Sequence, residues 1–333
     1  MELFGVEGLP EVRPGDDLAA LTAERADLQE GDVLCVSHTV VSKAEGRQAD
    51  LADYDPGERA RAIADRIGTL AGEQKDPRFA RAVIEESRAL LTEEPLLLAV
   101  TAFGHVAVNA GIDRSNVPDA DLLLLPEDPT ASARRLHEAL GVPVVVTDTS
   151  GRPFRLGQRG VAIGWAGIPA ARDWRGETDM TGKELGVTVE AVVDELAAAA
   201  NLLTGEGDDG IPAVVVRGFA FGDHDASDKL FRDPAGDYVQ DALEQWTYDP
   251  DRLRQKAGED LYDEAAGEDG GVGDGGDDGD VGDERDASDD RDGVRASDPD
   301  GSGQGSDPDG QRSDSEEGRQ DGDTSTSSDG DTQ

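Results

Sequence analysis

The sequence predicts an α+β protein in which mixed sheets and helices build two lobes. Short β-branched runs alternate with longer segments rich in Ala, Leu, Glu and Arg, and turn-forming residues separate the two kinds of segment. In addition, the sequence has no Gly-x4-Gly-Lys phosphate loop, and no Gly-x-Gly-x-x-Gly turn opens a helix after a strand. We therefore expect a fold of neither the Walker nor the Rossmann type.

The expected elements follow from these runs in chain order. Strands are predicted at residues 33–36, leading to Val40 and Val41, and at 96–101, 106–108, 122–125, 142–147, 161–163 and 213–217. Helices are predicted at 56–70, 77–91, 130–140, 187–203 and 235–246. The fourth helix carries an Ala-rich seam at 197–200, and Gly205 follows it as a C-terminal stop.

Composition divides the chain into a domain at residues 1–250 and an acidic tail rich in Gly, Asp and Ser at 251–333. From residue 267 onward there are 23 acidic and 5 basic side chains, no aromatic residue and five apolar side chains, all Val or Ala. Such a segment buries too little apolar surface to offset the loss of chain entropy on folding. We therefore expect the tail to be disordered.

The formal net charge of -43 excludes some partners. Residues 1–266 alone hold 51 acidic and 26 basic side chains, and only five of the basic ones are Lys. This pattern resembles proteins of salt-loving organisms, in which carboxylates keep the chain soluble. A surface this acidic repels phosphate backbones, so we expect no nucleic-acid partner.

The chain has a single cysteine, Cys35, so no disulfide can form within it, and this fits a reducing compartment. Cys35 lies inside a strand-like run, where we expect it to be buried. No run of about 18 apolar residues occurs, and the N-terminus lacks the pattern of a signal peptide. We expect a cytoplasmic protein with no membrane partner.

Two polar clusters follow strand-like runs. In NAGIDRSN, residues 109–116, Asp113 stands three positions before Asn116, and in DTSGRPFR, residues 148–155, Asp148 and Thr149 follow the run at 142–147. Hard oxygen ligands beside guanidinium groups suit a divalent cation that holds phosphate oxygens. We therefore predict a metal-dependent nucleotide site. The four histidines, by contrast, show no metal-ligand spacing.

A third segment, VVSKAEGR at residues 40–47, contains two cations and a glycine. Lys43 can neutralise a phosphate, and Arg47 offers a planar fork to phosphate or carboxylate. A surface loop of mixed charge is an equal alternative. The same choice applies to the acidic loop at 205–210, where Glu206 either reaches a cation or faces solvent.

The motifs VVSKAEGR, NAGIDRSN, DTSGRPFR, GVAIGWAGI and PAVVVRG, in this order and at these separations, closely resemble the archaeal coenzyme F(420)-0:L-glutamate ligase family. The resemblance covers residues 1 to about 247. It implies a two-lobed ligase that uses GTP to add L-glutamate to F(420)-0, and then a second, γ-linked glutamate, through an acyl phosphate. It also implies two Mg²⁺ or Mn²⁺ sites, assistance by K⁺, and a homodimer.

The resemblance further assigns residues by position. Asp113 and Asp148 match the ligands of one metal, and Thr149 with Glu206 those of a second. Residue chemistry alone supports Asp113, Asp148 and Lys43. The implied contacts of the guanine nucleotide are Leu9, Pro10, Glu11, Val12, His38, Thr39, Lys43, Asn116, Thr204, Gly205, Glu206, Gly207, Asp208, Asp209, Gly210 and Ile211.

The residues leave alternatives open. Arg152, Arg155 and Arg159 either point toward a substrate pocket or pair with surface carboxylates. The chain as a whole could also be a nucleotide- or coenzyme-binding module without catalytic activity. A further alternative is an amide ligase that acts on another carboxylate.

Overall fold

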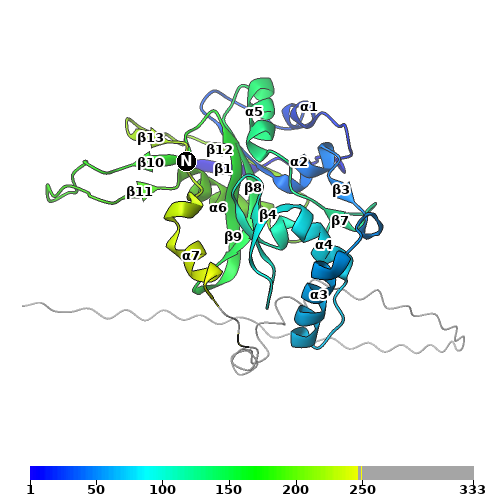
Figure 1. Cartoon of the computed structure of the whole chain (residues 1–333). Helices are drawn as coiled ribbons and strands as arrows, with labels where there is room; N and C mark the ends of the chain where they lie inside the picture. Colours follow the sequence, from blue (N-terminus) through cyan, green and yellow to red (C-terminus); the bar gives the residue numbers. More distant parts are fainter. Residues whose placement is uncertain (247–248, 250–333) are drawn as a thin grey trace, which may run out of the picture. The chain divides into compact units, whose positions relative to one another are not determined.

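The computed structural model describes residues 1–246 and residue 249 (Figure 1). All of them belong to one compact unit, Met1–Gly271, whereas the predicted tail at 251–333 lies outside the described residues. The predicted α+β class is confirmed, because helices and several mixed sheets alternate along the chain. Among the described helices, none has both the length and the apolar character needed to cross a bilayer.

The largest sheet has five strands. Their order across the sheet is β1 (Glu2–Gly5), β12 (Ala213–Arg217), β2 (Val33–Ser37), β8 (Val144–Arg152) and β9 (Arg155–Ala166). The central pair, β2 and β8, is parallel, and every other pair is antiparallel. The sheet is therefore mixed, with one parallel pair at its centre.

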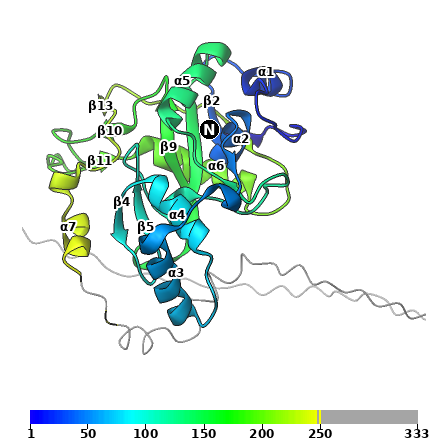
Figure 2. The same ribbon diagram turned by 45° about the vertical axis from the view of Figure 1, so that its right-hand side comes forward.

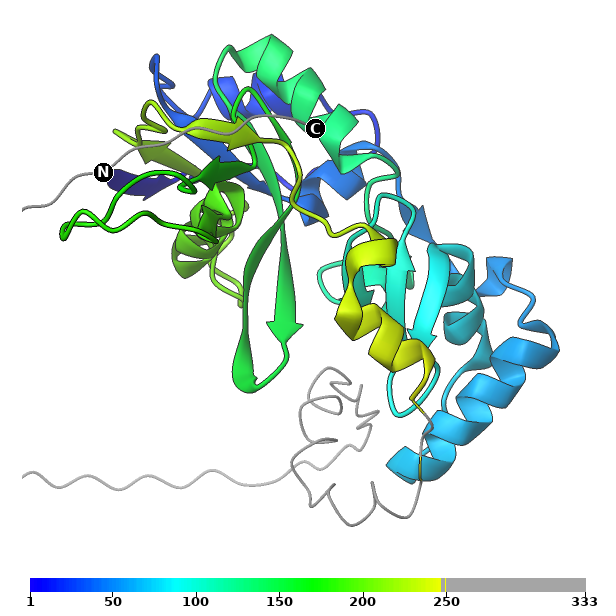
Figure 3. The ribbon, with the colours of Figure 1, turned by 60° about the vertical axis from the view of Figure 1, so that its left-hand side comes forward.

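Helices cover both faces of this sheet (Figures 2 and 3). Those on one face are α1 (Leu18–Ala23), α2 (His38–Ala44) and α5 (Pro129–Leu140), and α6 (Val192–Thr204) lies on the other. Successive side chains of a strand point to opposite faces, so Leu34 and Val36 pack toward α2 and α5, whereas Cys35 packs toward α6. Cys35 is buried, as expected from its place in a strand.

The two helix layers approach β9 closely at two glycines. A Cβ atom on Gly160 would lie 2.3 Å from the carbonyl oxygen of Ala197 in α6, and one on Gly164 would lie 2.3 Å from the carbonyl carbon of Pro129 in α5. Both distances are far below van der Waals contact, so any side chain would push a helix away from the sheet. The glycines of the motif GVAIGW are thus explained by packing.

A second region has its own hydrophobic core, in line with the expected second lobe (Figure 3). Its sheet has the order β4 (Ser87–Thr92), β5 (Leu98–Thr101), β6 (Val106–Val108). The helices α3 (Gly57–Ala71) and α4 (Pro77–Glu85) contribute Ile63 and Val83 to the core. The helix α7 (Tyr238–Glu244) contacts β4.

Smaller elements complete the fold. Three of them are the single turns of 3-10 helix η1 (Leu51–Asp53), η2 (Asn109–Gly111) and η3 (Pro234–Gly236). The short strands β3 (Gln48–Ala49) and β7 (Leu122–Leu123) pair with each other. The strands β10 (Ala171–Asp173), β11 (Val189–Glu190) and β13 (Asp225–Ser227) form a further small sheet.

Three predicted elements were wrong in part. Val40 and Val41 are helical, because Ser37 caps α2 by accepting a hydrogen bond from the amide of Thr39. The helix predicted at 77–91 ends at Glu85, and the following residues form β4, since pairing with β5 overrides their helix propensity. The helix predicted at 187–203 begins at Val192, because Val189–Glu190 pairs with β10 instead.

An ion pair joins Asp32, which precedes β2, to Arg217 at the end of the neighbouring strand β12. Asp32 is 1% exposed, and both of its carboxylate oxygens accept hydrogen bonds from Arg217, at 2.8 and 2.7 Å. The Arg217 hydrogen bonds outweigh burial and hold the pKa of Asp32 below its usual value. A depressed pKa stabilises the fold above the unfolded-state pKa, and this contribution is lost as the pH falls through the folded-state pKa.

Replacing Asp32 by Asn should therefore lower the free energy of unfolding near neutral pH, because Arg217 would lose the charge of its partner. Denaturant titration of both proteins checks this. The difference should begin to shrink as the pH falls below about 4, where the carboxylate of the unfolded chain is protonated, and should vanish only below the still lower folded-state pKa of Asp32. A difference that stays constant with pH would contradict the ion-pair explanation.

Candidate active site

The candidate site lies where the central parallel pair of strands ends. β2 ends at Ser37, which is paired with Thr147 of β8, and the chain then turns into α2 at His38. β8 continues beyond this point through Asp148 and Thr149, so these two residues face a space that β2 has left. Ligands of α/β sheets commonly bind at the carboxyl ends of parallel strands. Here the space is a cavity of about 960 Å³.

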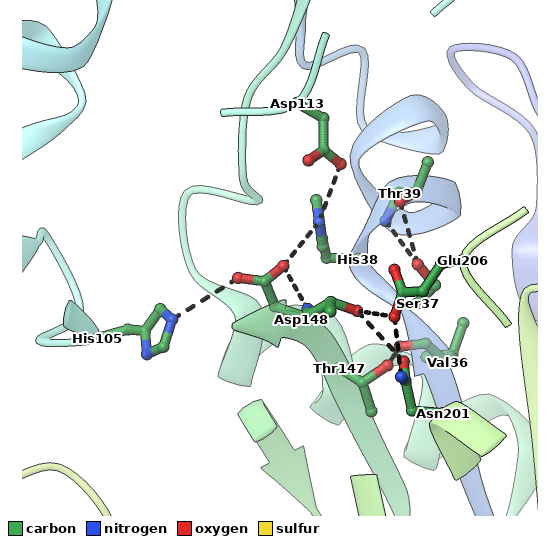
Figure 4. A network of polar contacts seen from close by, with 11 residues as sticks. Val36, Ser37, His38, Thr39, His105, Asp113, Thr147, Asp148, Asn201 and Glu206 are labelled. Atoms are coloured by element: carbon green, nitrogen blue, oxygen red, sulfur yellow. Dashed lines mark hydrogen bonds and ion pairs between the residues drawn. The ribbon is translucent and has the colours of Figure 1, made fainter. Parts of the chain in front are cut away.

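Asp113, Asp148 and His38 line this cavity and lie close together, and His105 lies beside Asp148 (Figure 4). The Nε2 atom of His38 lies 3.3 Å from Asp113 Oδ2 and 3.3 Å from Asp148 Oδ1. On the other side, His105 Nε2 lies 3.7 Å from Asp148 Oδ2. The Asp148 side chain is 8% exposed and that of His38 is 4% exposed, whereas Asp113 is 35% exposed and forms the solvent-facing side of the cluster.

The charges in this cluster depend on one another. Burial would lower the pKa of His38, but the carboxylates of Asp113 and Asp148 outweigh burial and raise it to about 10. Burial would likewise raise the pKa of Asp148, but the neighbouring His105 and His38 hold it well below its usual range. At neutral pH the cluster therefore contains an imidazolium between two carboxylates, which is a strongly polar centre at the base of a cavity.

A left-handed turn positions Asp113. Asn109, Ala110 and Gly111 all have positive φ angles, of 54°, 57° and 69°. Asn and Gly tolerate this conformation, whereas Ala does so at a cost, which the burial of Ala110 in the second core offsets. After the turn, the backbone of Asp113 exchanges two hydrogen bonds with Leu123, which fixes the carboxylate toward His38. The motif NAGID thus forms a turn that places the Asp113 carboxylate next to His38.

An aromatic cluster holds His105 against Asp148. The His105 ring is stacked on Phe103 at 6.5 Å between centroids, and it lies 5.9 Å from Phe231. Phe231 in turn contacts Trp165 of β9 at 6.0 Å. Residues from three separate parts of the chain therefore restrict this imidazole to one side of the Asp148 carboxylate.

A second group of polar side chains lies at the end of α6 (Figure 4). The Thr149 hydroxyl oxygen is 3.2 Å from Glu206 Oε1 and 3.2 Å from Asn201 Oδ1. Asn201 Nδ2 donates to Glu206 Oε1 at 2.9 Å. One oxygen of the exposed Glu206 side chain thus contacts both Thr149 and Asn201, and the loop itself is exposed to solvent.

Lys43 is buried at the mouth of the same cavity. Its side chain is 8% exposed, and its Nζ atom lies 2.6 Å from Glu11 Oε1. Glu11 itself is 54% exposed, so the pair has one buried cation and one solvated carboxylate. Arg47, by contrast, bonds to Glu86 and to the carbonyl of Leu125, and it does not line the cavity within the described residues. Of the two cations in VVSKAEGR, Lys43 therefore faces the site.

The donor set fits divalent cations that are only partly held by protein. Asp113 and Asp148 offer two carboxylates at one point, and Thr149 with Glu206 offers a hydroxyl and a third carboxylate. No group of three or more His, Cys, Asp or Glu side chains among the described residues forms a complete cage. Mg²⁺ and Mn²⁺ commonly take one or two carboxylates and complete their shells with water and phosphate oxygens.

The structure brings most of the predicted site residues together. The four residues assigned to metals all line the cavity. Asp209 is the one predicted nucleotide contact in the described chain that does not, and Arg152, Arg155 and Arg159 do not line it either. The predicted nucleotide contacts that line the cavity are Leu9, Pro10, Glu11, Val12, His38, Thr39, Lys43, Asn116, Thr204, Gly205, Glu206, Gly207, Asp208, Gly210 and Ile211.

Sequence reasoning missed several polar contributors, among them Ser37 and Thr147 at the strand ends. Asn201 and Gln158 line the cavity, and His105 faces Asp148. A signal existed for Asn201, which is a polar residue near the end of an otherwise apolar helix face. For His105 there was none, because it precedes β6 and contacts Asp148 of β8 across 43 positions of the chain.

Comparisons with known proteins agree on one family. The family described as F420-0:Gamma-glutamyl ligase matches residues 8–218. A protein named Coenzyme F420:L-glutamate ligase from Natronomonas pharaonis is 72% identical over 249 residues, which cover 75% of this chain and 98% of that protein. Proteins of the same name from Halorubrum lacusprofundi and Archaeoglobus fulgidus are 66% and 50% identical, over 75% and 73% of this chain and 100% and 98% of their own lengths.

Proposed function

This chain belongs to the F(420)-0:gamma-glutamyl ligase family, and from that premise we propose that it joins L-glutamate to coenzyme F(420)-0 at the expense of GTP, and then adds a second glutamate through a γ-linkage. The observation that carries the proposal is the convergence of Asp113, Asp148, Thr149, Glu206 and Lys43 on one cavity. Three carboxylates, a hydroxyl and a buried ammonium are the groups that a phosphoryl-transfer site requires.

The residues have distinct roles in this proposal. Asp113 and Asp148 would hold one divalent cation, and Thr149 with Glu206 a second. When bound, such cations supply neutralisation of the charge on the transferring phosphate. Lys43 would bind a phosphate oxygen through its ammonium group, in exchange for its present contact with Glu11. His38 would balance the carboxylates until the substrates arrive, because it lies between two of them.

The chemistry proceeds in two displacements. First, a carboxylate oxygen of the acceptor attacks the γ-phosphorus of GTP, and the bond from phosphorus to the β-phosphate oxygen breaks, which gives an acyl phosphate and GDP. Second, the amine of glutamate attacks the acyl carbon and phosphate leaves. Of the three ammonium protons, one stays on the amide, one goes to phosphate and one to solvent. Both displacements depend on positioning and charge neutralisation more than on a strong base.

Two further proposals concern the wider surroundings of the site. We propose a homodimer, which is supported by large apolar side chains that project from the surface, among them Phe154 and Leu156 where β8 turns into β9.

We also propose a role for K⁺ beside the divalent cations. The acidic composition and the high identity to proteins of halophilic archaea support activity in concentrated salt.

Mass spectrometry of the reaction products tests the proposed function. The purified protein is incubated in high salt with F(420)-0, L-glutamate, GTP and Mn²⁺, and parallel reactions contain ATP in place of GTP or lack the metal. We expect the mass of the coenzyme to rise by one or two glutamyl residues only with GTP and metal. No mass gain despite measurable GTP binding would favour a binding module, and a gain with another acceptor would identify a different amide ligase.

A further inference from the structure

We infer that Asn201 is a positioning residue that sets the oxygen atoms of Thr149 and Glu206 for the second divalent cation. The inference rests on the proposed function, because it concerns the two residues to which that cation is assigned. Asn201 lies near the end of α6 and lines the same cavity as Thr149 and Glu206. It touches both of them through a single carboxamide. Figure 4 shows Asn201 beside Glu206.

The chemistry of the partners determines the orientation of this carboxamide. The Glu206 carboxylate only accepts hydrogen bonds, so the atom 2.9 Å from its Oε1 must be the NH₂ group of Asn201. The carbonyl oxygen of Asn201 then faces the Thr149 hydroxyl at 3.2 Å, the same distance as Glu206 Oε1. With the carboxylate engaged by a cation, Asn201 Oδ1 would be the acceptor for the hydroxyl proton. One side chain thus donates to the carboxylate and accepts from the hydroxyl.

This arrangement leaves free the lone pairs that a cation requires. A hydroxyl coordinates a metal through its oxygen lone pair, and its proton needs an acceptor elsewhere, which Asn201 Oδ1 provides. The NH₂ group of Asn201 donates a hydrogen bond to Glu206 Oε1, so that Glu206 Oε2 stays available to coordinate a cation. Groups that orient metal ligands in this way typically contribute a factor of about 10 to 100 in metal affinity.

Packing of the backbone fixes the position of Asn201. A Cβ atom on Gly160 in β9 would lie 3.0 Å from Asn201 Cβ and 2.3 Å from the Ala197 carbonyl oxygen. The absence of a side chain at Gly160 therefore lets the end of α6 approach the sheet closely enough for the carboxamide to reach Thr149. The contact depends on two rigid elements, while Glu206 lies in the loop after the helix.

Titration with Mn²⁺ alone, followed by the electron paramagnetic resonance signal of free Mn²⁺, tests the inference on the full chain. The wild type should bind two ions. Asn201→Leu, which keeps the size but removes donor and acceptor, should raise the dissociation constant of the weaker site by about 10- to 100-fold and leave the tighter site unchanged. Leu202→Ala, at the exposed neighbouring position of the same helix, is the matched control and should change neither site.

A double-mutant cycle separates positioning from a general structural role. Because Asn201 is inferred to act through both Thr149 and Glu206, combining Asn201→Leu with Glu206→Gln should weaken the second site by less than the product of the two single effects. Fully multiplying effects in the double variant, or two unchanged sites in Asn201→Leu, would overturn the inference. Asn201→Ala serves as a second variant, and unfolding midpoints without metal confirm that the variants are folded. Fewer than two ions in the wild type would instead refute the two-cation site itself.

Discussion

Replacing Asp148 by Asn should lower turnover by about 10³-fold while the protein remains folded. The Asp148 carboxylate is buried between His38 and His105 and is held ionised by them. Asn has nearly the same shape, so packing should change little, but the neutral amide cannot neutralise a divalent cation. A site that acts by placing charge around a transferring phosphate should lose several kcal/mol of transition-state stabilisation when one such charge is removed.

The measurement is kcat for glutamate addition at saturating GTP and Mn²⁺, together with Mn²⁺ affinity in the absence of substrates. Asp65→Asn is the matched control, because Asp65 is an exposed carboxylate of α3 that does not line the cavity. Both kcat and Mn²⁺ affinity should fall in Asp148→Asn, whereas neither should change in the control. Near-normal turnover in Asp148→Asn would remove Asp148 from the metal site.

Replacing Lys43 by Met should weaken GTP binding by about 10- to 100-fold. A hydrogen bond from a charged donor contributes roughly 1.5 to 3 kcal/mol, and this range corresponds to that factor in affinity. The cost to stability should be small, because the partner Glu11 is half exposed and can be solvated when the ammonium is lost. Isothermal titration with GTP in high salt measures the effect.

Glu11→Gln distinguishes a phosphate-binding role of Lys43 from a purely structural one. This variant keeps the buried ammonium group of Lys43 but removes the carboxylate charge with which that group now forms an ion pair. GTP should bind to Glu11→Gln at least as tightly as to the wild type, since the ammonium no longer exchanges partners. Equal GTP affinity in Lys43→Met and the wild type would mean that Lys43 serves only to pair with Glu11.

An element could be predicted from sequence where the residue pattern of the segment and its packing in the fold favour the same secondary structure. β6, β12 and α5 lie within a residue or two of their expected bounds, because their local propensities and their packing favour the same structure. β4 was predicted as helix, since its Ala and Leu residues favour helix and only pairing with β5 makes it a strand. Tertiary pairing of this kind leaves no local signal.

In the candidate site, too, residues with a local sequence signal were predicted and residues brought together only by the fold were missed. Asp113 and Asp148 were singled out because hard oxygen ligands after strands indicate a cation, and the structure places both against His38. The histidines were set aside for lack of metal-ligand spacing, yet His38 and His105 flank Asp148. Spacing along the chain detects ligands that share one element, whereas these contacts join α2, β8 and the residue that precedes β6. The Asn201 carboxamide was missed for a similar reason, because its partners come from β8 and a loop.

The two carboxylates of the first proposed cation site belong to separately packed cores. Asp113 follows Ile112, which packs in the core of α3 and α4, whereas Asp148 belongs to a strand of the main sheet. A cation held by both carboxylates binds only when both cores are folded. Its binding free energy therefore adds to the cooperativity of folding, so that the two cores unfold as one unit when it is bound and can open separately when it is absent.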